Sequence, residues 1–123
     1  MMKERLLFVA AGQAQIGAIR EERSSGYNVI AIDGSSVAPG LIEADESRVA
    51  NILDPEEIIG VFKETNADGI LSISCDAAME AVAIACKKLG VPGVPLDVVQ
   101  ISRSKLKQRE AISAGGLSTP DFR

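Results

Sequence analysis

Histidine and tryptophan are absent from this sequence, and only two cysteines occur among its 123 residues. Without histidine the chain cannot form a histidine-based catalytic dyad or triad, and two cysteines do not supply the ligand spacing of a zinc site. We interpret Cys75 and Cys86 as small buried side chains of a protein that works in the reducing cytoplasm. The absences therefore exclude the commonest catalytic and zinc-binding arrangements.

Long apolar runs and an excess of positive charge are missing as well. The longest apolar stretches, such as Leu6–Ala11, fall far short of the roughly 20 residues that cross a bilayer, and no targeting segment is visible. The 13 Lys and Arg residues against 17 Asp and Glu residues give a net charge of −4. A nucleic-acid surface needs clustered basic residues, so we expect neither a nucleic-acid partner nor a membrane partner.

Aromatic residues are also scarce, with three Phe and one Tyr, yet the hydrophobic content is 46%. Aliphatic side chains therefore supply the core. The length suits one globular domain that buries about two thirds of its unfolded surface.

Short apolar runs alternate with helical patterns along most of the chain. Helices are predicted over Gln13–Ser25, Pro55–Asn66 and Ala77–Leu89, with Asp54 as the N-cap of the second helix and an acid at N3 in a capping-box arrangement. Strands are predicted over Leu6–Ala11, Tyr27–Ile32, Ser47–Ile52, Gly69–Ile73 and Val91–Val94. This alternation indicates a three-layer, Rossmann-like α/β fold with five parallel strands in the order 3-2-1-4-5 and helices on both faces.

The pattern changes after the last predicted strand. Two helical pieces follow, roughly Asp97–Ser102 and Ser104–Ala114, and no further apolar strand accompanies them. We therefore expect a Rossmann-like domain over residues 1–95 and a helical connector over residues 96–123.

Ligands of open parallel sheets bind beyond the carboxyl ends of the strands. The first such end is Gly12-Gln13-Ala14-Gln15, a glycine turn that opens a helix, where free N–H groups favour an anion. A small-anion site and a purely structural turn both fit this loop. A dinucleotide fingerprint does not fit, because Ala14 stands where the central glycine should be, although Asp33 occupies the place of a ribose-binding acid. A receiver domain is excluded, since it needs an acidic pair where Ala10 and Ala11 stand.

Two further residues are candidates for the site. Asp76 follows the fourth predicted strand, and it either caps the next helix or directs its carboxylate into the crevice beside Gln15. Lys105 lies in the first turn of the last predicted helix, where the helix dipole disfavours a cation. It can be a solvated lysine, and its position is also compatible with a nearby anionic ligand.

The closing segment "SKLKQREAISAGGLSTPDF" resembles the motif D-K-x-x-x-R-x-x-L-x-x-A-G-V-P-T-P-x-F that leads into the ATP-grasp fold, with Ser104 and Ser118 replacing an Asp and a Pro. The stretches "FVAAGQAQIG", "GYNVIAID", "APGLIEADES", "DPEEI" and "ADGILSISCDAAMEAVAIACKKLGVPG" resemble earlier motifs of the same family, in the same order. The chain is thus similar to the N-terminal, pre-ATP-grasp domain of carbamoyl-phosphate synthase large chains, biotin carboxylase and purine-biosynthetic carboxylate ligases.

This resemblance implies an enzyme that uses ATP to convert a carboxylate or bicarbonate into an acyl phosphate, which an amine or a related nucleophile then attacks. It places Lys105 near the nucleotide phosphates, and it places the acceptor substrate near Gly12, Gln13, Ala14, Gln15, Asp33 and Asp76. The magnesium ligands and most of the ATP cleft would lie in later subdomains, so no catalytic or metal-ligating residue is assigned within this chain.

We therefore expect a small carboxylate and ATP as partners, with a homodimer as a further option. By itself the chain should be inactive, and Arg123 should mark a boundary within a longer gene. The alternative is a free-standing module that binds a nucleotide or a small anion without catalysis.

Overall fold

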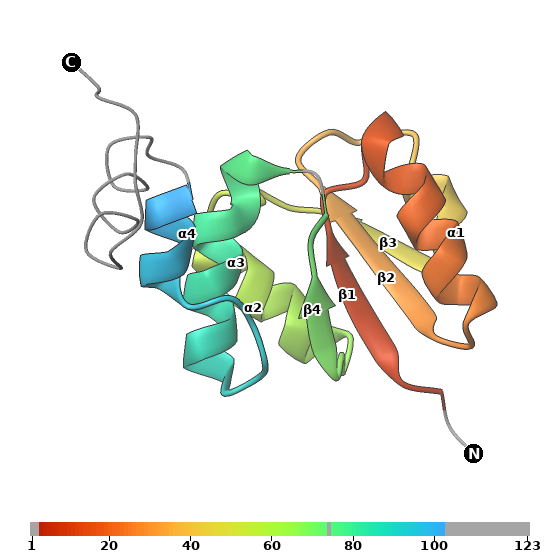
Figure 1. Cartoon of the computed structure of the whole chain (residues 1–123). Helices are drawn as coiled ribbons and strands as arrows, with labels where there is room; N and C mark the ends of the chain where they lie inside the picture. The colour runs from red at the N-terminus through yellow and green to blue at the C-terminus, as the bar shows by residue number, and fades with distance from the viewer. Residues whose placement is uncertain (1–2, 74, 103–123) are drawn as a thin grey trace, which may run out of the picture.

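The computed structural model describes residues 3–73 and 75–102 and has a parallel sheet at its centre (Figure 1). Its strands are β1 (Arg5–Val9), β2 (Asn28–Asp33), β3 (Glu46–Val49) and β4 (Gly69–Leu71). They are paired in the order β3-β2-β1-β4, and every pair is parallel. The predicted α/β class and the parallel sheet are therefore confirmed, whereas the third strand begins one residue earlier than predicted and ends three residues sooner.

Helices cover both faces of the sheet. A short 3-10 turn, η1 (Gln13–Gln15), leads into α1 (Ile16–Ser24), and a second 3-10 turn, η2 (Leu41–Glu43), precedes β3. The other helices are α2 (Pro55–Glu64), α3 (Asp76–Leu89) and α4 (Leu96–Ser102). None of the helices within the described residues has the length and apolar character of a membrane span.

Alternate strand residues supply two separate cores. On one face Leu7, Val9, Ile30 and Ile32 pack against Ile58 and Ile59 of α2 and small residues of α3 (Ala78, Ala81 and Ala85). On the other face Phe8, Val29 and Ala31 pack against Ile19 of α1 and Leu41 of η2. Because successive strand side chains point to opposite faces, these continuous apolar strands require cover on both sides.

The start of α2 follows the sequence signal with one difference. The Asp54 carboxylate accepts a hydrogen bond from the Glu56 N–H at 2.9 Å, and Pro55 occupies the first helical position. The Glu57 side chain accepts from the Asn51 N–H at 3.2 Å instead of closing a capping box on Asp54. The Asp54 carboxylate thus caps the first turn of α2, and the Glu57 carboxylate holds Asn51 of the preceding loop.

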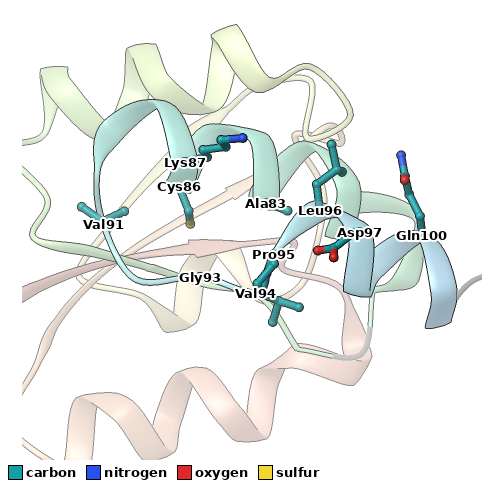
Figure 2. A pocket seen from close by; sticks show the side chains of 10 residues that line it. All are labelled: Ala83, Cys86, Lys87, Val91, Gly93, Val94, Pro95, Leu96, Asp97 and Gln100. Atoms are coloured by element: carbon teal, nitrogen blue, oxygen red, sulfur yellow. The ribbon is translucent and has the colours of Figure 1, made fainter. Parts of the chain in front are cut away.

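The predicted fifth strand is wrong for the part of the chain that the structure describes. Pro92 and Pro95 have no N–H to donate to a ladder, and the Val91 N–H donates to the Cys86 carbonyl at 3.1 Å. A Cβ placed on Gly93 would lie 2.6 Å from the Cys86 Cβ. Residues 91–94 are therefore held against the end of α3, where they close the helix and lead into α4 (Figure 2).

At the amino end of the sheet, Arg5 connects all the strands. Its guanidinium donates to the Asn28 side chain of β2 at 2.7 Å, to the Thr65 carbonyl at 2.8 Å and to the Glu46 carboxylate of β3. Its backbone N–H donates to the Asp68 carboxylate, next to β4, at 2.8 Å. The side chain of Arg5 thus links β1 to β2 and β3, and its backbone links β1 to Asp68 beside β4.

Candidate functional site

The candidate residues other than Lys105 lie at the carboxyl edge of the sheet. Gly12–Gln15 follow β1, Asp33 ends β2, and Asp76 begins α3, beyond the end of β4. Lys105 lies outside the described residues, so its proximity to the other candidates remains a prediction. Three loops at this edge form what we call the rim. They are Ala10–Gln15, Asp33–Ser36 and Ile73–Asp76, the last without residue 74, which the structure does not describe.

Asp33 joins two loops of the rim. One carboxylate oxygen accepts from the Ala11 N–H at 2.9 Å, and the other accepts from the Ser35 N–H at 2.9 Å. Hydrogen bonds to an ionised acceptor are shorter and stronger than neutral ones. The carboxylate that the sequence offered as a ribose ligand is therefore engaged with the backbone on both of its oxygens.

The chain leaves β1 through a conformation that is unusual for its residue type. Ala10 has a φ of 80°, in the left-handed region, and its N–H still donates to the Ile32 carbonyl of β2 at 2.9 Å. A side chain other than glycine in such a region costs about 1–3 kcal/mol and persists only where the surroundings enforce it. This turn could not be predicted from the sequence, because alanine has no preference for it.

Gly40 contacts the same loop from the other side. The sequence did not mark this residue as a candidate. Its N–H donates to the Ala11 carbonyl at 2.6 Å, and a Cβ at this position would lie 2.6 Å from that carbonyl oxygen. Only glycine allows two backbones to approach so closely. The available signal was the Pro39-Gly40 pair, which the sequence marks only as part of a loop.

Gln15 connects the first loop to the end of β4. Its side chain is only 4% exposed. The side-chain oxygen accepts from the Gly12 N–H at 2.8 Å, and the side-chain nitrogen donates to the Ile73 carbonyl at 2.9 Å. The amide is thus used as a buried cross-connection between two loops of the rim.

Gln13 and Ala14 are the exposed residues of this first loop. Within the described residues their N–H groups have no acceptor, because they begin the helical stretch that continues into α1. The dipole of that stretch favours a negative partner at this end. The loop can therefore receive an oxygen atom of a ligand through its backbone.

Asp76 does not cap α3, so the prediction that it serves as the N-cap of this helix is wrong. The N-cap is Cys75, which makes no side-chain capping bond, and Asp76 is the first helical residue. Its side chain is exposed. A carboxylate in the first turn interacts favourably with the helix dipole and remains available to solvent or to a ligand.

The rim carries carboxylates but no basic side chain, since neither Lys nor Arg occurs in Ala10–Gln15, Asp33–Ser36 or Ile73–Asp76. Within residues 3–73 and 75–102 no group of three or more Cys, Asp or Glu side chains is arranged to hold a metal ion. The rim by itself therefore offers an anion backbone N–H groups but no positively charged side chain.

A groove of about 540 Å³ lies apart from these residues, between α3 and residues 91–100 (Figure 2). Ala83, Cys86 and Leu96 contribute to its apolar lining, and Lys87 and Asp97 add opposite charges. Burial raises the pKa of the Cys86 thiol above its ordinary value. No residue that the sequence marked as a substrate ligand lines this groove, so the rim remains the candidate site.

Comparison with known proteins gives the fold a context. No family model matches the chain. The formate-dependent phosphoribosylglycinamide formyltransferase of Prochlorococcus marinus (strain MIT 9301) is 35% identical over 69 residues, which are 56% of this chain and 18% of that protein. The structure of phosphoribosylglycinamide synthetase from Anaerococcus prevotii matches with a TM-score of 0.81 and 27% identity, over 96% of this chain and 30% of that one. The chain matches the N-terminal domain of ATP-grasp enzymes.

A further structure with the same fold was solved with a nucleotide. N5-carboxyaminoimidazole synthetase from Staphylococcus aureus, in complex with ADP, matches with a TM-score of 0.75 and 19% identity, over 94% of this chain and 31% of that one. This chain therefore spans about a third of each of these two solved structures and less than a fifth of the curated relative. The resemblance inferred from the motifs is confirmed at the level of this domain.

Proposed function

We propose that this chain is the substrate-side, N-terminal domain of a cytoplasmic ATP-grasp ligase that joins a carboxylate to an amine. A carboxylate oxygen attacks the γ-phosphorus of ATP and releases ADP, which leaves an acyl phosphate. The amine nitrogen then attacks the acyl carbon, phosphate departs, and the amine loses a proton. Acyl phosphate formation converts a poor leaving group, oxide, into a good one, phosphate.

One observation carries the assignment of the domain's role. The loops of the rim are connected by Asp33 and Gln15, and the connected structure leaves the N–H groups of Gln13 and Ala14 without an acceptor among the described residues. Such a fixed pair of donors suits an oxygen atom of a bound substrate, because no reorganisation is needed when the ligand arrives.

We assign the following roles on this basis. Gly12, Gln13, Ala14, Gln15, Asp33 and Asp76 form the substrate side of the site. Lys105 supplies a mobile positive charge to the nucleotide phosphates. ATP and magnesium would be held mainly by residues outside this chain, so the chain contributes neither the metal ligands nor a catalytic group.

The test uses the protein encoded by the complete reading frame. Carboxylates, including formate and bicarbonate, are supplied with ATP, magnesium and an amine, and ADP release is followed. With an ¹⁸O-labelled carboxylate we expect one labelled oxygen to appear in the released phosphate, because the acyl phosphate breaks at its carbon. Nucleotide binding without turnover over a broad panel of carboxylates and amines would favour the binding module instead.

The 123-residue chain provides a second test. We expect no ADP formation from the purified chain with any carboxylate, because the nucleotide cleft and the metal ligands are assigned to other parts of the enzyme. ADP release above the rate of a buffer control would contradict this division of the site.

A further inference from the structure

The backbone of Ala11 is held from both sides, by Asp33 at the end of β2 and by Gly40 in the loop that follows. Its N–H donates to the Asp33 carboxylate at 2.9 Å, and its carbonyl accepts from the Gly40 N–H at 2.6 Å. Both backbone hydrogen-bonding groups of Ala11 thus have partners that are distant in the sequence. Ala11 is fully buried, so no water replaces either contact.

The residue before Ala11 shows why this hold is needed. Ala10 has a φ of 80°, which an alanine adopts only when its surroundings enforce it. A loop that served the fold alone could place glycine at this position at little cost. An enforced conformation beside a candidate site is instead the arrangement expected where the direction of the following residues matters.

The fixed position passes along the chain to the exposed residues. Gly12 follows Ala11 directly, and its N–H and carbonyl both bond to Gln15, at 2.8 Å and 3.1 Å. The backbone is therefore held at Ala11 and again at Gly12, immediately before Gln13. The positions of Ala11 and Gly12 therefore determine the orientation of the N–H groups of Gln13 and Ala14.

We infer that Asp33 and Gly40 are positioning residues: together they fix Ala11 and so aim the N–H groups of Gln13 and Ala14 at the substrate. This inference rests on the proposed ligase function. Asp33 thus belongs to the site but acts through the backbone, with both carboxylate oxygens already accepting hydrogen bonds. Gly40 acts by the absence of a side chain, since any Cβ would displace the Ala11 carbonyl.

The kinetic test compares Asp33→Asn, Gly40→Ala and the double variant in the complete enzyme. The asparagine amide has one acceptor oxygen, so one backbone N–H loses its acceptor, while the alanine displaces Ala11 from the opposite side. We expect each single variant to lower kcat/KM about tenfold, mainly through KM of the substrate. Because both act on Ala11, the double variant should fall little further than the worse single variant.

Val37→Ala is the matched control, since Val37 is 85% exposed in the loop between Asp33 and Gly40 and lies outside the rim. It should leave kcat/KM unchanged. Losses that multiply to about a hundredfold in the double variant would mean that Asp33 and Gly40 act independently, and would overturn the inference.

A second measurement separates this inference from the ligase function. In the ¹⁵N-labelled 123-residue chain, Asp33→Asn and Gly40→Ala should both shift the amide resonances of Gly12, Gln13 and Ala14, and Val37→Ala should not. Unchanged amides in both variants would overturn the inference even if the enzyme is a ligase. Shifted amides in a protein without ligase activity would refute the proposed function and leave the hold on the loop established.

Discussion

Replacing Gln15 by leucine tests whether the rim is held together as the structure indicates. The substitution keeps a similar volume at a site that is 4% exposed. It removes the acceptor of the Gly12 N–H and the donor to the Ile73 carbonyl, which lie 2.8 Å and 2.9 Å from the side-chain amide. Gly12 and Ile73 are both partly accessible, so water can replace part of what is lost.

The magnitude follows from the two lost hydrogen bonds. A buried polar group left without its partner costs about 1–3 kcal/mol, and the partial access of both groups to water keeps the sum within that range. The unfolding constant should therefore rise roughly 5- to 140-fold, since each 1.4 kcal/mol is a factor of ten.

Urea unfolding of the 123-residue chain, followed by circular dichroism, measures this change. Gln13→Leu is the matched control, because Gln13 is exposed in the same 3-10 turn and its substitution should stay within about 0.5 kcal/mol. If Gln15→Leu costs no more than Gln13→Leu, the side chain of Gln15 does not connect the loops, and the reasoning about the rim fails.

Three further predictions concern single residues. Gly40→Ala should cost about 1–3 kcal/mol in urea unfolding through its contact with Ala11, whereas Gly60→Ala, with open space in the interior of α2, should gain about 0.5–1 kcal/mol; equal effects would contradict the close approach at Gly40. Burial raises the pKa of the Cys86 thiol, so the folded chain binds this proton more tightly than the unfolded chain. The resulting contribution to the free energy of unfolding is complete below the ordinary pKa of 9.0 and is lost as the pH rises through the raised pKa. Urea midpoints above pH 9 should therefore fall more for the wild-type chain than for Cys86→Ala, and parallel curves would argue against the buried thiol. In the complete enzyme Lys105→Ala should raise KM for ATP while Lys107→Ala does not, and unchanged ATP kinetics would remove Lys105 from the nucleotide site.

The sequence predicted the features that depend on neighbouring residues. Continuous apolar runs located β1 and β2, and the Asp54-Pro55 pair located the start of α2. Gly90, with a φ of 70°, ends α3 as its position in the sequence predicted. These signals are local, and the structure confirms them because no tertiary contact opposes them.

The features that the sequence did not predict depend on contacts between distant segments. The apolar character of residues 91–94 favoured a strand, but the approach of Gly93 to Cys86 holds this segment against α3. The conformation of Ala10 depends on partners from β2 and from the loop after it, and no property of alanine announces it. The candidate residues of the rim were found by their place after strands, whereas the role of Gly40 needed the structure.

The hydrogen bonds of Arg5 bear on which residues of this domain can be substituted during evolution. Its hydrogen bond to Asn28 and its ion pair with Glu46 link the strands at the amino end of the sheet, remote from the rim. The exposed loop residues at the opposite end, such as Gln13 and Ser36, take no part in these contacts between strands. Under the proposed function, substitutions there would change the surface that meets a substrate, while the contacts of Arg5 would stay in place.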